Sequence, residues 1–246
     1  IRLPPRSTLF PTTTLFRSPY GTKSADTVRT YAINAGAFFE EHGVKMIVVA
    51  CNSASSVALD SLRERWGERP VIGVIEPGAQ ASAESAGDVL VLATEATVAS
   101  GAYEHAIRNV RPDARVRALP ATLFVALAEE GWTSGATVEA VVRDVLRPAL
   151  EEGAPSCVLL GCTHFPVLAG VIRGVLGEGV RVVDSAGTTA EAVARVLEER
   201  DLLASGRQAG TERLCVTDGS PRFARISSHF LGRVVCAEDI TLVDLV

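Results

Sequence analysis

Short apolar runs, several of them rich in β-branched residues, alternate along the chain with segments whose apolar positions recur at helical spacing. Runs of the first kind indicate buried parallel strands, and segments of the second kind indicate amphipathic helices. The predicted strands are residues 45–50, 71–75, 88–93, 115–119, 157–160, 180–184, 213–217 and 233–236. The predicted helices are residues 24–43, 55–66, 137–152, a stretch from about 166, and 188–202. This alternation predicts an α/β fold with mostly parallel sheets.

The chain contains one series of segments twice. An apolar strand, a cysteine motif, a helix and a second apolar strand occur at residues 45–75 and again at residues 156–184. We therefore predict two pseudo-symmetric domains, each a mostly parallel sheet flanked by helices, with the active site between them. Domain A would comprise residues 19–80 and 186–246, and domain B would comprise residues 81–185.

Cys51 and Cys162 stand at matching places in these two series. Each follows an apolar run that predicts a strand, and each precedes a segment with helical spacing. In open α/β sheets, ligands bind beyond the carboxyl ends of the strands, so both thiols are expected at such a place. The N-terminus of a helix favours negative charge, and we expect it to lower the pKa of each thiol from its reference of about 8.5.

Polar side chains follow each cysteine directly. Asn52 and Ser53 come after the first cysteine, and Thr163 and His164 come after the second. Such side chains supply the hydrogen-bond donors that the carboxylate of an amino acid requires. A general acid or base in this position contributes about 10²–10⁴-fold to a rate. The two motifs therefore favour acid–base chemistry on two faces of one substrate.

A cysteine that ends a core strand is more often a packing residue than a catalytic one, because cysteine is among the most buried residue types. The repeated context, rather than either residue alone, favours a catalytic role. Cys157, Cys215 and Cys236 lie inside apolar runs and are expected in the core. The histidines that are expected to be structural or solvated are His42, His105 and His229.

The composition narrows the class of protein. The chain of 246 residues is 47% apolar and 22% charged, which is ordinary for a soluble globular protein. A net charge of −5 gives no electrostatic reason to expect nucleic acid as a partner. No apolar run approaches the ~20 residues of a membrane-spanning helix. The five cysteines form no CxxC pair and no zinc spacing. We expect a cytoplasmic protein with no metal, cofactor or membrane contact.

Residues 1–18 differ from the rest of the chain. They contain three prolines, four threonines and three arginines, but no acidic residue. They also lack an apolar stretch of the length found in signal peptides. We interpret this leader as non-native sequence or as a disordered tail, outside the two domains.

The motifs around these residues resemble those of a known family. Residues 50–55 and 161–166 are similar to the two signature motifs of bacterial glutamate racemases, and residues 19–24 are similar to that family's substrate-binding segment. Further matches lie at residues 73–78, 93–98 and 129–131. The resemblance covers the chain from Pro19 to its C-terminus.

The resemblance implies racemisation of glutamate without a cofactor. In this family one cysteine thiolate removes the α-proton, and the other thiol returns a proton on the opposite face. The product, D-glutamate, feeds peptidoglycan synthesis. By this resemblance Cys51 acts on D-glutamate and Cys162 acts on L-glutamate. The implied substrate contacts are Tyr20, Gly21, Asn52, Ser53, Thr163 and His164.

The chain departs from the family's pattern in two places. Ser53 stands where the family usually has Thr, so the hydroxyl is kept. The family also opens with a strand that ends in Asp-Ser-Gly-x-Gly-Gly, and residues 1–18 contain no such motif. In the family this Asp is thought to assist the first cysteine, and this Ser to bind the substrate. We therefore expect the 246-residue chain to be inactive or severely impaired, and poorly stable.

Other interpretations remain open. A related aspartate or hydantoin racemase would use the same cysteine pair, although residues 20–23 and 164–166 favour glutamate. A non-catalytic remnant of this fold would bind a dicarboxylate without exchanging its α-proton. A redox role would require a disulfide between Cys51 and Cys162. The sequence also leaves a homodimer open.

Overall fold

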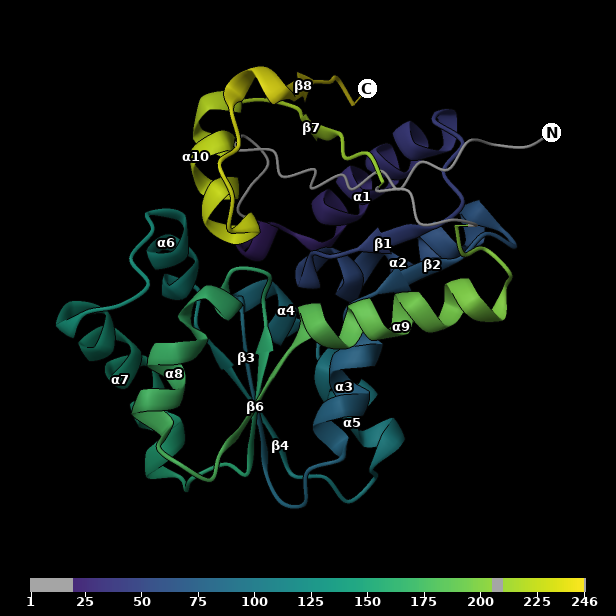
Figure 1. The fold of residues 1–246 in the computed structure, drawn as a ribbon. Coiled ribbons are helices and arrows are strands. Elements are labelled where there is room, and N and C mark those ends of the chain that lie inside the picture. The colour runs from purple at the N-terminus through teal and green to yellow at the C-terminus, as the bar shows by residue number, and fades with distance from the viewer. Residues whose placement is uncertain (1–19, 205–209, 246) are drawn as a thin grey trace.

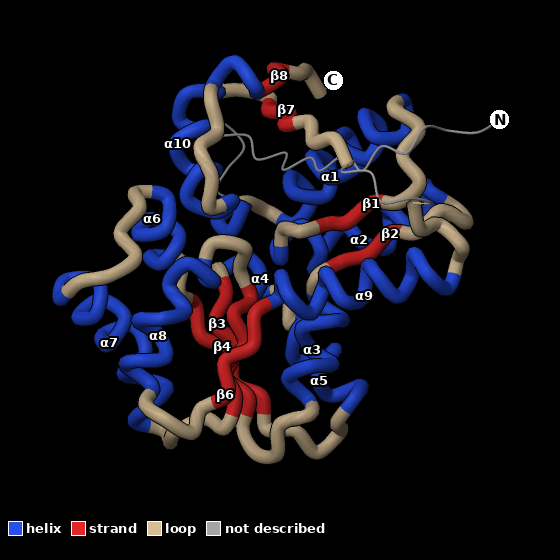
Figure 2. The backbone as a smooth tube through the Cα atoms, viewed as in Figure 1, coloured by secondary structure: helices blue, strands red, loops and turns tan. Residues whose placement is uncertain are grey.

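The computed structural model describes residues 20–204 and 210–245 of the chain. In this part the chain forms three parallel sheets flanked by helices, which confirms the predicted α/β class (Figure 1, Figure 2). One sheet has four strands and the other two have two strands each. The leader at residues 1–18 lies outside the described residues, and the predicted domain boundaries stay a prediction.

The four-stranded sheet forms the lower half of the molecule in Figure 1. Its order is β4-β3-β5-β6, and every pair is parallel. All residues of β3 and β5 are buried, as the apolar runs of two central parallel strands require. The strands are β3 (Val89–Ala93), β4 (Val116–Pro120), β5 (Cys157–Gly161) and β6 (Arg181–Asp184).

Helices cover both faces of this sheet (Figure 1). Successive side chains of a strand point to opposite faces. Leu90 and Leu92 of β3 therefore pack with α6, α7 and α8, whereas Val89 and Val91 pack with α3 and α5. The bounds of these helices are α3 (Ile75–Ala83), α5 (Ala102–Val110), α6 (Leu123–Glu129), α7 (Ala136–Glu151) and α8 (Ala169–Leu176).

The second sheet is built from the first part of the chain. β1 and β2 pair in parallel, and α2 connects them. Leu59, Leu62 and Trp66 of α2 pack against Ile47 and Val71 of this sheet. α9 follows β6 and runs beside α3 back towards β2 (Figure 1). The bounds are α1 (Ala25–Glu41), β1 (Ile47–Val49), α2 (Asn52–Trp66), β2 (Val71–Gly73) and α9 (Ser185–Glu199).

The third sheet is small, and α10 connects its two strands. Phe223 and Ala224 of α10 pack with Leu214, Val216 and Val235. α10 also lies beside α6, at the upper left of Figure 1. The remaining elements are η1 (Tyr20–Thr22), α4 (Glu95–Ala99), η2 (Phe165–Leu168), β7 (Leu214–Val216), α10 (Ser220–Leu231), η3 (Ala237–Asp239) and β8 (Ile240–Leu242).

The repeated series that the sequence predicts is present in the structure. β1 leads through α2 to its parallel neighbour β2, and β5 leads through η2 and α8 to its parallel neighbour β6. Cys51 and Cys162 each lie just beyond the carboxyl end of the first strand of a series. The structure thus confirms that the two thiols occupy equivalent places.

Several predicted boundaries are wrong. The strand predicted at residues 71–75 ends at Gly73, because Glu76 and Pro77 lie in the first turn of α3, where proline needs no amide hydrogen. The strand predicted at residues 233–236 is absent from the described chain there, and β8 supplies the pairing with β7 instead. Helices α3, α4, α5, α6 and α10 were not predicted.

Among the described helices, none has the length and apolar character needed to cross a bilayer.

Candidate active site

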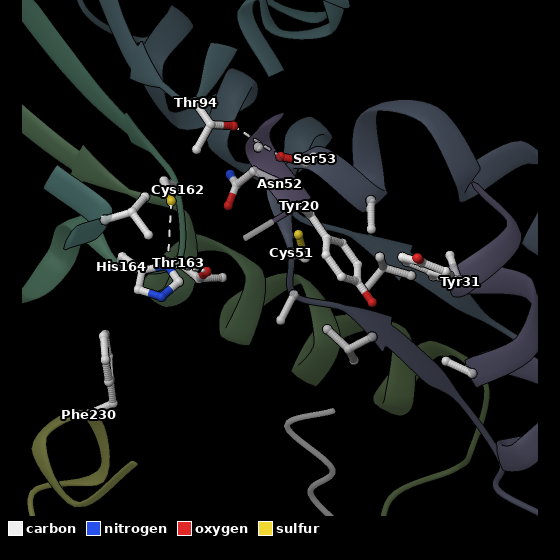
Figure 3. Close-up of a pocket in the computed structure, with 18 of the residues that line it drawn as sticks. Tyr20, Tyr31, Cys51, Asn52, Ser53, Thr94, Cys162, Thr163, His164 and Phe230 are labelled. Atoms are coloured by element: carbon white, nitrogen blue, oxygen red, sulfur yellow. Dashed lines mark hydrogen bonds between the residues drawn. The ribbon is translucent and has the colours of Figure 1, made fainter. Parts of the chain in front are cut away.

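A cavity of about 350 Å³ lies where the two cysteine series meet (Figure 3). Its wall is formed by η1, α1, β1 and the start of α2, together with residues of α6, α10 and the loop after β5. Cys51 and Cys162 both line this cavity. So do all the residues predicted to contact substrate, which are Tyr20, Gly21, Asn52, Ser53, Thr163 and His164.

Cys51 is the N-cap residue of α2. Its backbone is extended, with φ −74° and ψ 123°, because the chain passes here from β1 into the helix. Its side chain makes no capping hydrogen bond, but the backbone N–H groups of Ala54 and Ser53 lie close enough to favour its thiolate form. The free N–H groups of a helix start therefore face this thiol, as predicted.

Cys162 follows β5 and is 6% exposed. The helix that follows is not contiguous with it, since the short η2 comes between Cys162 and α8. The backbone N–H of His164 hydrogen-bonds the sulfur of Cys162. The His164 ring also reaches this thiol, with 3.7 Å between Nδ1 and Sγ (Figure 3).

Burial opposes the ionisation of both thiols. It raises the pKa of Cys51 above its ordinary value, although the backbone N–H groups of Ala54 and Ser53 act in the opposite direction. Burial also raises the pKa of Cys162 to about 12, against the hydrogen bond from His164, and the nearby Cys51 adds to the increase. The predicted lowering of both pKa values is wrong, because the loss of hydration outweighs the hydrogen bonds.

His164 links the second thiol to a carboxylate. Its Nε2 lies 3.5 Å from Oε1 of Glu129, whose side chain is 15% exposed. The hydrogen bond from His164 lowers the pKa of Glu129, against burial, and Arg222 adds to the lowering. Arg222 of α10 donates to the other carboxylate oxygen at 3.0 Å. Phe230 of α10 packs edge-on against the His164 ring, with 5.6 Å between the centroids.

Three buried hydroxyls join the first cysteine motif to the loop after β3. Ser53 Oγ lies 3.0 Å from Thr94 Oγ1 and 3.0 Å from Thr97 Oγ1, and the two threonine oxygens are 3.2 Å apart. Gly21 of η1 packs directly on this cluster, since a Cβ there would lie 2.4 Å from Cβ of Thr94. A glycine is therefore required at position 21 for the Tyr20 segment to reach the cavity.

The side chain of Asn52 makes a second buried link between the halves of the site. Asn52 Nδ2 donates to the hydroxyl of Tyr103 at 2.7 Å and lies 3.4 Å from Ser185 Oγ. Tyr103 is 2% exposed, and burial raises the pKa of its hydroxyl, which therefore stays neutral. Sequence patterns alone could not reveal this contact, because Asn52, Tyr103 and Ser185 come from three distant segments.

Most of the remaining contributions to the cavity are apolar. Ala32, Ala35, Gly36 and Phe39 of α1 line one side, and α10 lines the other. Thr163, in contrast, is exposed at the rim. Within the described ranges, no group of three or more His, Cys, Asp or Glu side chains converges as metal ligands would. In the described part of the lining, Glu129 is the one carboxylate, and it lies on the Cys162 side.

The model of the Asp/Glu/Hydantoin racemase family matches residues 3–193 of this chain. The chain belongs to that family. A curated glutamate racemase from Geobacter metallireducens is 42% identical over 218 residues, which is 88% of this chain and 80% of the relative. One from Neisseria meningitidis serogroup B is 40% identical over 231 residues, covering 93% of this chain and 84% of the relative.

Solved structures agree with this assignment. The glutamate racemase of Francisella tularensis, in complex with D-glutamate, superposes with a TM-score of 0.88 at 30% identity, over 98% of this chain and 89% of that one. The enzyme of Thermus thermophilus, in complex with β-chloro-D-alanine, has a TM-score of 0.85 at 37% identity, over 98% and 88%. The protein is thus an isomerase with the two-domain α/β architecture of these enzymes.

Proposed function

We propose that this protein interconverts L-glutamate and D-glutamate with Cys51 and Cys162 as its two acid–base groups. The observation that carries the proposal is that the two thiols come from equivalent places in the repeated series and line one cavity. Similarity to glutamate racemases, one of them solved with D-glutamate, supports the choice of substrate.

In the direction from L-glutamate, the Cys162 thiolate removes the α-proton and becomes a thiol. The Cys51 thiol then gives its proton to the opposite face of the carbanion and becomes a thiolate. In the reverse direction Cys51 acts on D-glutamate and Cys162 returns the proton. Each turnover from L-glutamate therefore ends with a Cys162 thiol and a Cys51 thiolate. A proton must pass from Cys162 to Cys51, directly or through solvent, before the next turnover in the same direction.

The groups around each thiol support its charged form at the moment it is needed. Backbone N–H groups lie beside both sulfur atoms and would stabilise a thiolate when it forms. The His164–Glu129 pair lies beside Cys162 and is placed to accept the proton that this thiol must lose. Tyr20, Gly21 and Ser53, with the hydroxyl of Thr163 at the rim, would hold the two carboxylates of the substrate.

We propose slow turnover for the 246-residue chain. No carboxylate among the described residues of the cavity accompanies Cys51, whereas Glu129 and His164 accompany Cys162. We further propose that the protein acts in the cytoplasm and that its D-glutamate serves peptidoglycan synthesis. A homodimer stays a prediction, and light scattering is its test.

The function is tested by incubating the chain with L-glutamate and separating the enantiomers by chiral chromatography. We expect D-glutamate to accumulate above the uncatalysed rate, and to return to that rate in both Cys51→Ala and Cys162→Ala. Cys236 was expected in the core, but the structure shows it exposed, because the strand predicted around it does not form. It gives a matched control, and Cys236→Ala should keep the parent's rate.

Parallel incubations separate the alternatives. Turnover of L-aspartate faster than L-glutamate would assign the chain to aspartate racemisation. Binding of glutamate without D-glutamate formation would favour a non-catalytic binding protein. A mass change from a Cys51–Cys162 disulfide, with reversible loss of activity on oxidation, would favour the redox role.

A further inference from the structure

A chain of buried polar groups runs beneath the cavity and joins the two cysteine motifs. Asn52 follows Cys51 directly, and its Nδ2 lies 2.7 Å from the Tyr103 hydroxyl. The same Nδ2 lies 3.4 Å from Ser185 Oγ. Ser185 Oγ in turn donates to the carbonyl oxygen of Leu160, in the strand that leads to Cys162, at 3.4 Å. The last acceptor in the chain is therefore a backbone carbonyl.

That carbonyl sets the direction of every bond in the chain. A carbonyl oxygen can only accept, so the proton of the Ser185 hydroxyl points at Leu160. The oxygen of Ser185 is then free to accept, and Asn52 Nδ2 donates to it at 3.4 Å. Because the Tyr103 oxygen also accepts from Asn52, the Nδ2 end of the amide, and not the oxygen end, lies on this side.

The orientation of the amide leaves the oxygen of Asn52 facing the cavity. Asn52 is 2% exposed and lines the cavity, and its Oδ1 is buried without a hydrogen-bond partner among the described residues. Figure 3 shows this oxygen on the side of the amide that faces Cys162 and His164. A buried acceptor without a partner is costly, so a donor on the ligand is its natural partner.

We propose that Tyr103 is a positioning residue that fixes the amide of Asn52 with its oxygen towards the ligand, where it accepts a hydrogen bond from the substrate's ammonium group. The inference rests on the proposed function and deepens it. An ammonium group has only donors and a carboxylate has only acceptors, so an amide held in this orientation distinguishes the two ends of the α-carbon. The choice of amide orientation thus sets which substituent of the α-carbon lies beside Asn52.

The packing of the Tyr103 ring explains how it can hold this position. A Cβ at Gly161 would lie 2.9 Å from the ring, and a Cβ at Gly78 would lie 3.4 Å from it. The ring therefore fills the space that two glycines leave, directly before Cys162 and within α3. Tyr103→Phe keeps the ring in this space and removes only the hydroxyl.

The test compares two ligands that differ in the ammonium group. D-glutamate and glutarate share both carboxylates, and glutarate has no amine. Their dissociation constants are measured by calorimetry for the parent, Tyr103→Phe and Ser185→Ala. We expect both variants to bind D-glutamate about tenfold more weakly, as the loss of a charge-assisted hydrogen bond requires, and to change glutarate binding less than about threefold.

Ser82→Ala is the matched control, because Ser82 is a fully buried serine whose hydroxyl bonds Gly78 within α3 and contacts neither Asn52 nor Ser185. It should leave the ratio of the two dissociation constants at the parent value. Thermal unfolding of each variant identifies any that is not folded, and Ser185→Ala then serves in place of Tyr103→Phe.

Equal weakening of both ligands, or unchanged binding of D-glutamate in a folded Tyr103→Phe, would overturn the inference. Neither outcome tests the proposed function, which depends only on whether the unsubstituted protein racemises glutamate. A parent that binds D-glutamate but forms no L-glutamate would refute the proposed racemisation and leave the assignment of the amide intact.

Discussion

Each thiol of the cysteine pair lies in surroundings that hold it in the neutral form. Burial raises the pKa of Cys51 and raises that of Cys162 to about 12. The proposed two-thiol chemistry needs one thiolate and one thiol at the same time. At neutral pH the reactive form of the free protein is therefore a minor one.

The first prediction concerns the pH dependence of the rate. Because both thiol pKa values are raised, the fraction of protein with one thiolate increases with pH from 7 to 9. We expect kcat/KM for glutamate to rise across this range, by up to about tenfold per pH unit. A rate that is flat or falls over this interval, in a protein that remains folded, would show that a thiolate is not the base. Racemisation assays from L-glutamate and from D-glutamate measure kcat/KM at each pH.

The second prediction concerns Glu129. The hydrogen bond from His164, and then the charge of Arg222, hold its pKa below the ordinary value. A depressed folded-state pKa stabilises the protein above the unfolded value of about 4.3, and this stability is lost as the pH falls through the folded value. Glu129→Gln should therefore lower the free energy of unfolding by about 1.5–3 kcal/mol at pH 6, and by less at pH 3.

Urea denaturation at the two pH values measures this difference. Glu139→Gln is the matched control, because Glu139 pairs with Arg143 on the exposed surface of α7 and should contribute less than about 1 kcal/mol. An equal loss of stability at pH 6 and pH 3 in Glu129→Gln would mean that its charge is not what stabilises the fold.

The residues of the site divide by how far apart their partners lie in the chain. Cys51 and Cys162 could be predicted, because an apolar strand, a thiol and polar neighbours form a local pattern. Tyr103, Ser185 and Arg222 could not, because their partners are brought to them only by the folding of distant segments. The thiol pKa values were predicted in the wrong direction, because local sequence shows a helix start but not how deeply it is buried.

At the scale of elements, the strands of the four-stranded sheet could be predicted closely, because continuous apolar runs have few other uses in a soluble protein. The start of α9 was predicted at residue 188, and this is wrong. The helix begins at Ser185, and Asp184, which ends β6, accepts hydrogen bonds from the amides of Ala186 and Gly187. Asp184 is both the last residue of the strand and the N-cap of the helix, so no loop pattern separates the two elements.

The third prediction tests that cap. Asp184→Ala removes the acceptor of two free amide groups at the start of α9 and should lower the free energy of unfolding by about 1 kcal/mol. Asp60→Ala, at an exposed position inside α2, is the control and should change it by less than about 0.5 kcal/mol. Chemical denaturation of both variants measures the difference. Equal effects would mean that Asp184 does not act as a cap.

At the scale of the whole molecule, two similar units each bring one thiol to a shared cavity. β1 and β5 end beside the same space, and α9 carries the chain from one unit back to the other (Figure 1). The two thiols differ in their polar neighbours, since Glu129 and His164 lie on the Cys162 side. Two equivalent thiols with different polar neighbours are suited to a reaction whose two directions use different bases.

The most direct test of the two-thiol account is the incubation of L-glutamate in D2O, followed by chiral chromatography with mass spectrometry. Two thiols on opposite faces predict that the first D-glutamate formed carries deuterium at Cα, while the remaining L-glutamate keeps its proton. Cys51→Ala and Cys162→Ala should form no D-glutamate. D-glutamate that retains the original proton, or that forms at the parent's rate without either cysteine, would contradict the account.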